Sequence, residues 1–325
     1  MHRYARSLAS LALTASALCA AAPAQALDYP EKPVRIVVGM APGGSNDTIA
    51  RLIGSALQER LQQPFVVENK PGANSTIATA EVARTRPDGY NLMLVISSHV
   101  TNTMLYPKLN YKLEDFKPVT VIAEAPFVLV ANPKFPPNNV REFISYAKSR
   151  PERTIDFGTP GMGSTQHIAM ELMDQVAGTK MNHVPYKGGA PAQADLIGGV
   201  IPVIFATPTQ SLPYLQSGQL KALGVTSPQR IPQLPDTPTF AESGLKDYEA
   251  TVWFGIVAPA GTPDEIIRLL NKEIVDLVKN QPIKGKLEEM GLNPIGSTPE
   301  EFQALLDSET TKWADVIRKA NISLQ

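Results

Sequence analysis

Cysteine is almost missing from this chain of 325 residues, and the single one, Cys19, lies close to the N-terminus. A chain with one cysteine forms no internal disulfide and offers no thiolate cluster for a metal ion. Leu18 stands before Cys19, where a lipid-modified cysteine calls for a small residue, so lipidation is the disfavoured alternative. We therefore expect neither cysteine catalysis nor a cysteine metal site in the folded protein.

Neither sign of charge prevails, because 30 lysines and arginines stand against 31 aspartates and glutamates. This balance gives no reason to expect a nucleic-acid partner. Histidines are also few: beyond the N-terminal segment they are His99, His167 and His183. His183 lies in an apolar strand and is expected in the core, and His167 is expected to be packed or solvent-facing. Since no close carboxylate cluster accompanies them, we expect no metal site.

Motifs of catalysis and of cofactor binding are missing as well. The sequence has no Gly-x-Ser-x-Gly, no His-Glu-x-x-His and no Gly-x-x-x-x-Gly-Lys-Ser/Thr. The run that begins at Gly161 starts like a dinucleotide fingerprint, but Gln166 stands where its third small residue belongs. We therefore expect no cofactor and no enzyme, and an enzyme acting on a carboxylic acid remains the remote alternative.

Long apolar runs are confined to the N-terminus. Arg3 and Arg6 precede an apolar segment over residues 8–22, and Ala24-Gln25-Ala26 follows as a small-x-small cleavage site. The segment is short for a membrane span, and polar sequence follows it directly. We expect residues 1–26 to be a signal peptide that is removed after Ala26, which leaves an exported, soluble chain of 325 − 26 = 299 residues.

Prolines and glycines, 29 and 22 in number, fall mostly between apolar runs. Strand-like and helix-like patterns alternate along the chain, which is typical of α/β folds with largely parallel sheets. Because the chain is too long for one ordinary core, we expect two lobes, each a mostly parallel sheet flanked by helices. Lobe 1 is predicted over residues 27–128 and 255–325, and lobe 2 over residues 129–254.

A glycine-rich loop joins an apolar strand at Val34–Val38 to an amphipathic helix expected over Ser45–Leu61. Glycine lets the backbone approach a ligand closely, and the first amides of a helix, with its dipole, attract an anion. On this motif alone, a tight turn with an Asn or Asp cap is an equal alternative. The candidate ligand contacts here are Ala41, Pro42, Gly43, Gly44, Ser45, Asn46 and Asp47. Of these, Asp47 is expected mainly to fix the loop by accepting hydrogen bonds.

Other strands are also expected to end in loops of small or polar residues, and ligands bind at the carboxyl ends of strands in open α/β sheets. In lobe 1 these residues are Asn74, Ser75, Ser97, Ser98 and His99. In lobe 2 they are Gly161, Gly163, Ser164, Thr165, Tyr186, Ala206 and Thr207. Facing loops on two lobes predict capture of a small anion through amides and hydroxyls. No arginine is placed at these loops, and Arg51 is expected to form a surface or structural ion pair.

Six motifs, spread over nearly the whole chain after residue 26, resemble the Bug-type extracytoplasmic receptors of tripartite tricarboxylate transporters. They are Tyr29-Pro30-x-Lys32-Pro33-Val34-Arg35-Ile36-Val37-Val38, Pro42-Gly43-Gly44 with Asp47, Val67-Glu68-Asn69-Lys70-Pro71-Gly72-Ala73, Pro87-Asp88-Gly89-Tyr90, Val184-Pro185-Tyr186-Lys187-Gly188 and Ala258-Pro259-Ala260-Gly261-Thr262-Pro263. The resemblance implies a periplasmic, monomeric receptor with a two-lobe Venus-flytrap fold, a small organic carboxylate as ligand and membrane transporter subunits as partner. A periplasmic sensing module that feeds a signalling protein is the alternative.

Two departures from the family pattern bear on the ligand. Asn74 and Ser75 stand where many relatives have glycines, and Ala206 stands where many have an aspartate. An acid at that place could accept a hydrogen bond from an ammonium or a hydroxyl group. Its absence favours a carboxylate without an amino group and with an apolar body, unless the relatives' aspartate is purely structural.

Overall fold

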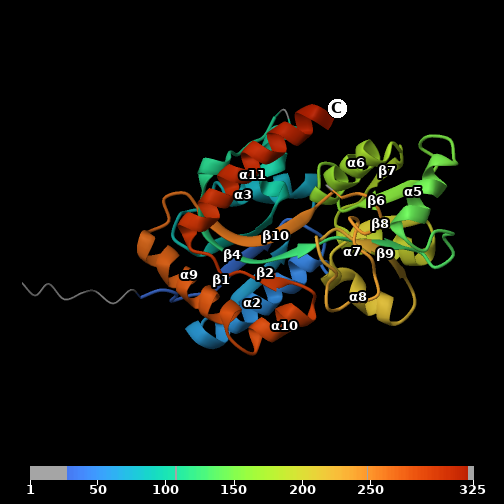
Figure 1. Cartoon of the computed structure of the whole chain (residues 1–325). Coiled ribbons are helices and arrows are strands. Elements are labelled where there is room, and N and C mark those ends of the chain that lie inside the picture. The colour runs from blue at the N-terminus through green and yellow to red at the C-terminus, as the bar shows by residue number, and fades with distance from the viewer. Residues whose placement is uncertain (1–27, 107, 247, 321–325) are drawn as a thin grey trace, which may run out of the picture.

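The computed structural model describes residues 28–106, 108–246 and 248–320, and the expected signal peptide, residues 1–26, lies outside them. Within the described residues the strands form two separate sheets, which occupy the two halves of the molecule in Figure 1. We call the first sheet and its helices lobe 1, and the second sheet and its helices lobe 2. The two-lobe α/β fold expected from the sequence is confirmed.

The first sheet has the strand order β11-β4-β10-β3-β1-β2. Its strands are β1 Val34–Val38, β2 Phe65–Asn69, β3 Asn91–Ile96, β4 Phe116–Pro126, β10 Thr251–Pro259 and β11 Asn293–Pro294. β1 pairs in parallel with β2 and β3, whereas β10 is antiparallel to both β3 and β4. The carboxyl ends of β1, β2 and β3 therefore lie at one edge of the sheet, followed by the loops after Val38, Asn69 and Ile96.

The second sheet has the order β7-β6-β8-β5-β9. Its strands are β5 Val128–Ala131, β6 Asp156–Thr159, β7 Asn182–Pro185, β8 Val203–Ala206 and β9 Lys221–Val225. β6 pairs in parallel with β7 and β8, and β5 runs antiparallel to β8 and β9. Each sheet is thus mixed. In the first sheet β10 runs against its neighbours β3 and β4, and in the second sheet β5 runs against its neighbours β8 and β9.

Helices cover both faces of the first sheet (Figure 1). One face is covered by α2 Ser45–Leu61, α9 Asp264–Lys279 and α10 Ile283–Glu289, and the other by α3 Thr76–Val82, α4 Ser98–Leu105 and α11 Pro299–Ala320. The 3₁₀ turns η1 Ala73–Ser75 and η2 Leu113–Asp115 complete lobe 1. None of the helices in the described part of the chain is long and apolar enough to cross a membrane.

Lobe 2 is covered by α5 Val140–Lys148, α6 Thr165–Ala177, α7 Gly189–Gly198 and α8 Pro208–Gln216. The chain crosses between the lobes twice, once from β4 directly into β5 and once through the segment that leads from β9 to β10. A continuous apolar core passes between the lobes at these crossings, through Phe127, Tyr248, Ala250 and Val252. The expected lobe boundaries at residues 128 and 254 stay predictions, and β10 already pairs in the first sheet from Thr251.

Most elements expected from apolar periodicity form, including the strand at Val34–Val38 and the helix over Ser45–Leu61. One expectation is wrong: Ser97, Ser98 and His99 do not form a loop, because α4 begins at Ser98 directly after β3. All three side chains are buried against the sheet. Because these residues are polar, nothing in the sequence indicated that they begin a helix whose inner face packs against the sheet.

Candidate functional site

The carboxyl-terminal edges of the two sheets face each other, and the loops that follow the strands touch. The Ala41 amide donates to the Lys187 carbonyl at 3.2 Å, and the Tyr106 hydroxyl donates to the Met162 carbonyl at 3.0 Å. The hydroxyls of Ser45 and Thr207 lie 2.5 Å apart. The lobes are therefore closed on each other at the place where the sequence predicts a ligand.

Between the lobes lies a small space, which we call the cleft cavity. Its polar walls are Ser45, Asn46, Gln166, Thr207 and Gln210, and its apolar walls are Met40, Ile96, Pro160, Val252 and Phe254. Among the residues that the structure describes, no charged side chain lines it. Its volume of about 30 Å³ holds roughly two waters, since one water needs about 10–15 Å³. A ligand of several heavy atoms therefore does not fit into the cleft cavity alone while the lobes are closed.

The amino end of α2 forms one wall of the cleft cavity. Gly43 adopts a left-handed backbone with φ +82°, which glycine takes without strain, and Gly44 is the N-cap residue in an extended conformation. No side chain caps α2, so the first helical amides are not satisfied by a capping group. An anion in the cavity would meet these amides and the positive end of the helix dipole.

Asp47 holds this loop in shape, as expected. Its Oδ2 accepts from the Gly43 amide at 3.0 Å, and its Oδ1 lies 2.9 Å from Arg51, which also donates to Asn69. Burial acts to raise the pKa of Asp47, but hydrogen bonds from Arg51, Gly43 and Asn69 outweigh burial and hold the pKa below its ordinary 3.8. The Gly43 amide and both carboxylate oxygens are thus already paired within the protein, and Arg51 forms the expected structural ion pair.

The loop after β2 has an unusual backbone. Ala73, Asn74 and Ser75 follow one another with φ of +43°, +50° and +73°. Such conformations are uncommon for residues other than glycine and persist where the surroundings fix them. Gly39 makes room for this loop, because a Cβ there would stand 2.4 Å from the Ser75 Cβ. Asn74 is thereby brought to the lobe interface, next to Gly161 of lobe 2, whereas Ser75 lines a pocket within lobe 1.

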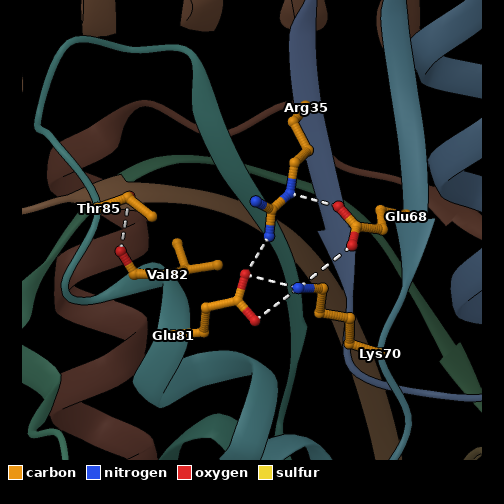
Figure 2. Close-up of polar contacts among 6 residues, drawn as sticks. All are labelled: Arg35, Glu68, Lys70, Glu81, Val82 and Thr85. Atoms are coloured by element: carbon orange, nitrogen blue, oxygen red, sulfur yellow. Dashed lines mark hydrogen bonds and ion pairs between the residues drawn. The ribbon is translucent and has the colours of Figure 1, made fainter.

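Two basic and two acidic side chains anchor the start of the same loop (Figure 2). Arg35 on β1 lies 2.7 Å from Glu68 on β2 and 2.5 Å from Glu81 on α3. Lys70, just past β2, lies 2.7 Å from Glu81 and 3.2 Å from Glu68. The Lys70 hydrogen bond, and then that of Arg35, lowers the pKa of Glu81. This network ties β1, β2 and α3 together where the loop leaves the sheet.

In lobe 2, the loop before α6 is held by two histidines whose rings stack at 3.8 Å. The Gly163 amide donates to His167 Nδ1 at 3.1 Å, and Thr159 Oγ1 lies 2.6 Å from His183 Nε2. Burial, and then the neighbouring His167, lower the pKa of His183 to about 3. Both rings therefore serve the shape of the loop, and His183 is half-buried instead of a full core residue.

The structure places the remaining candidates at different distances from the cleft. Ser164 caps α6 by accepting from the His167 amide, and the buried Thr165 hydroxyl has no hydrogen-bond partner among the described residues. Tyr186 donates to Asp195 within lobe 2 at 2.7 Å. Ala206 lies in the core of lobe 2, because β8 stays paired with β5 up to that residue, and Thr207 is the first to reach the cleft.

Sequence reasoning missed two glutamines that line the cleft cavity. Gln166 was seen only as a mismatch to a cofactor motif, although it stands in the first turn of α6. Gln210 belongs to α8, a helix that begins at Pro208 and contains Pro213, which masked its pattern. A polar residue in the first turn after a glycine loop was the available signal for Gln166.

A second space, which we call the side cavity, adjoins the cleft cavity and shares Met40 and Pro160 with it. Its volume is about 190 Å³, and Asn74, Tyr106, Gly161, Tyr186 and Lys187 are among its walls. Both lobes contribute to it, so the two cavities are parts of one interlobe space. A larger hollow of about 560 Å³ lies on lobe 2 alone, around Asn132–Pro136 and Gly199, away from the interlobe walls.

His99 lies beneath the cleft cavity in a small polar pocket that also has Asn46, Ser75 and Asn102 as walls. Its ring stacks 6.1 Å from Tyr111 and meets the edge of Phe116 at 5.0 Å. Neither ring nitrogen has a hydrogen-bond partner among the described residues. Burial lowers the pKa of His99 to about 4. The neutral ring therefore supports the floor of the site, and its side chain does not reach the cleft cavity walls.

The buried His99 is expected to make the protein sensitive to mild acid. The pKa of His99 is about 4 in the folded protein, whereas its ordinary value is 6.5. Above pH 6.5 the ring is neutral in both the folded and the unfolded protein. As the pH falls from 6.5 toward 4, the unfolded chain binds a proton that the folded protein does not, so the folded state loses stability. By pH 5 the loss amounts to about 2 kcal/mol of unfolding free energy. We expect His99→Phe to show a smaller fall of melting temperature between pH 7 and 5, and Tyr111→Phe to keep the full fall. An equal fall of melting temperature in the unaltered protein and in both variants would contradict this role for His99.

Two α/β lobes that close around a small space lined by loops and helix ends define a ligand-capturing receptor of the periplasmic-binding-protein class. The family model for the tripartite tricarboxylate transporter family receptor matches residues 49–322. The chain therefore belongs to this receptor family, and its relatives include Bug proteins. It is 35% identical to Protein BugT of Bordetella pertussis over 323 residues, which cover 98% of this chain and 99% of BugT.

Solved structures agree with this placement. A protein described as Rhodopseudomonas palustris Rpa4515 with adipate is 36% identical at a TM-score of 0.88, over 91% of this chain and 99% of that one. The periplasmic binding protein BugD is 34% identical at a TM-score of 0.88, over 91% and 100%. MatC of the same Rhodopseudomonas species, with bound malate, is 32% identical at 0.84, over 89% and 100%. The solute-binding role expected from the sequence is therefore confirmed for the family.

Proposed function

We propose that this protein is a periplasmic receptor that captures a small organic carboxylate between its lobes and delivers it to a membrane transporter of the tripartite tricarboxylate type. The observation that carries the proposal is the uncapped amino end of α2 at Gly44–Asn46, which faces a cavity whose described walls carry no charged side chain. A carboxylate is matched there by backbone amides and the helix dipole and meets no opposing acid. Binding requires no bond to be made or broken.

The lining of the cleft cavity supports a ligand with a polar and an apolar part. Ile96, Val252 and Phe254 present apolar surface beside the polar side chains of Asn46 and Gln166. Relatives solved with adipate and malate support a carboxylate as the polar part. Membership of the receptor family supports delivery to a transporter.

A thermal-shift screen of the mature protein, unfolded and refolded to free it of any carried-over ligand, tests the proposal. The panel contains monocarboxylates, dicarboxylates and aromatic carboxylates, with matched alcohols as controls. A ligand at about 100 times its Kd adds roughly 2.7 kcal/mol of stability, which gives a clear rise in melting temperature. We expect a rise for one class of acids and none for the alcohols.

A flat response to every acid would contradict carboxylate capture. If one acid binds, its uptake is then measured in cells with and without the gene for this chain. Uptake that falls when the gene is deleted supports delivery to a transporter. Uptake that stays equal contradicts delivery and leaves capture standing, which is the result expected of a sensing module.

A further inference from the structure

The side cavity contains one buried side chain whose hydrogen bonds are incomplete. Asn74 is 5% exposed and lines this cavity. Its Nδ2 donates to Asn102 Oδ1 at 2.8 Å, while its Oδ1 has no hydrogen-bond partner among the described residues. A buried polar atom without a partner is costly, so the position of this residue in the wall of a ligand space points to a ligand group as its partner.

The orientation of the Asn74 amide is fixed by its neighbour. Asn102 Nδ2 donates to the Asn74 backbone carbonyl at 2.9 Å, so Asn102 turns its oxygen toward the Asn74 side chain. An oxygen can only accept, and it therefore needs the nitrogen of Asn74 opposite it. The atom of Asn74 left over is the oxygen, which accepts a hydrogen bond and cannot donate one.

The backbone holds this acceptor at the lobe interface. Asn74 is the middle one of three consecutive residues with positive φ, and a Cβ on Gly161 of lobe 2 would stand 3.7 Å from the Asn74 Cα. A left-handed run of this kind is kept only where the surrounding structure fixes it. The hydrogen bond that Asn102 donates to the Asn74 backbone carbonyl holds this run in place from within lobe 1.

The charges around Asn74 decide which donor fits. Among the described residues, no aspartate or glutamate lines the cleft cavity or the side cavity, and the carboxylate of Asp47 is paired with Gly43 and Arg51. Lys187 lines the side cavity, and its ammonium has no ion pair within the described residues. An ammonium group of a ligand would find a lysine and no acid among the described walls of this cavity. An uncharged hydroxyl can donate to Asn74 without that penalty.

We propose that Asn74 accepts a hydrogen bond from a hydroxyl group of the ligand, so that the receptor selects hydroxy-substituted carboxylates over unsubstituted and amino-substituted acids of the same length. The proposal rests on the proposed function, because the carboxylate is held at the amino end of α2. It assigns Asn74 as a specificity-determining residue and the side cavity as the place for the hydroxyl-bearing part of the ligand.

Two matched series of acids test the proposal, with Kd measured by calorimetry. The first is succinate, both enantiomers of malate, and aspartate; the second is glutarate, both enantiomers of 2-hydroxyglutarate, and glutamate. One additional buried hydrogen bond is expected to make one hydroxy acid of a series bind about tenfold more tightly than its unsubstituted parent. The amino acid of each series is expected to bind most weakly.

Asn74→Gly is the variant that tests the residue, because glycine adopts the same positive φ without strain and the backbone contact with Asn102 remains. We expect the ratio between hydroxy and unsubstituted acid to fall from about ten to about one. Asn110→Ala, at an exposed position away from both cavities, is the matched control and keeps the ratio. Melting temperatures check that both variants are folded.

Three results would overturn the proposal: equal affinity for hydroxy and unsubstituted acids, tightest binding of an amino acid, or an unchanged ratio in Asn74→Gly. If none of these acids binds while another carboxylate of the thermal-shift panel does, hydroxyl selection fails and carboxylate capture stands. If no carboxylate binds at all, both fail together.

Discussion

Replacing Gly44 with aspartate is expected to abolish carboxylate binding, with a loss of at least about 100-fold in affinity, while the protein remains folded. Gly44 has φ −85° and ψ 174°, an extended conformation open to any residue. A Cβ there would lie 3.9 Å from its nearest neighbours, the Ala190 amide and the Ala41 carbonyl, which is ordinary contact. Aspartate is also a favoured N-cap residue, so α2 should gain stability.

The expected loss arises because the new carboxylate takes the place of the ligand. It would accept from the same first amides of α2 and would oppose a second negative charge in a cavity with no cationic side chain among its described walls. A 100-fold loss corresponds to about 2.7 kcal/mol of binding free energy. Calorimetry with the acid that gives the largest thermal shift measures the effect.

Gly44→Asn is the matched control, since it adds a side chain of the same size without the charge. We expect it to weaken binding clearly less than Gly44→Asp, and the difference between the two measures the electrostatic part. Should both variants bind as tightly as the unaltered protein, the loop at Gly44 is not part of the site. A loss of the same size in both would assign the effect to steric exclusion alone.

The part of this site nearest to β1 could be predicted because its local sequence determines it. Apolar residues at intervals of three or four define α2 with both ends correct, and glycines before it leave few alternatives for the turn. The role of Asp47 also followed from local reasoning, because a short acidic side chain close to a helix start accepts from nearby amides. Contacts within about five residues are readable from a sequence.

The rest of the site depends on residues far apart in the chain. Ser45 meets Thr207 only because the lobes close, and Asn74 is oriented by Asn102, 28 positions away. No periodicity in the sequence records such contacts. Polar residues are equally ambiguous in themselves: Ser98 and His99 looked like a loop, but they begin a buried helix whose packing overrides their low helix propensity.

The mixed sheets have a related cause. Parallel pairing follows where a strand, a helix and another strand succeed one another, as from β1 through α2 to β2, and this local order is visible in the sequence. β10 joins the first sheet after the chain has passed through the whole of lobe 2, so its antiparallel direction depends on where that passage ends. Fold class was therefore predictable, whereas the direction of the crossing strands was not.

Replacing Phe302 with alanine is expected to have the largest effect on stability, a loss of about 3–5 kcal/mol of unfolding free energy. Phe302 is fully buried on α11, its ring centre lies 5.3 Å from that of Trp253, and it packs on Gly255, where a Cβ would stand 2.5 Å from its ring. Gly255, opposite the ring, has no side chain that could fill the space left by the substitution. Denaturant unfolding followed by Trp253 and Trp313 fluorescence measures the loss.

The same variant tests whether α11 links the lobes. Beyond Phe302, this helix runs toward lobe 2 (Figure 1). Its Trp313 packs with Ile168 of α6 in lobe 2 and with Leu105 of α4 in lobe 1. If Phe302 anchors the helix, its loss should weaken carboxylate binding as well as stability, because the closed arrangement loses the contacts that α11 makes with both lobes. Gln303→Ala, at an exposed position on the same helix, should change stability by less than about 0.5 kcal/mol. A Phe302→Ala protein as stable as the Gln303→Ala control would show that α11 is not docked through this ring.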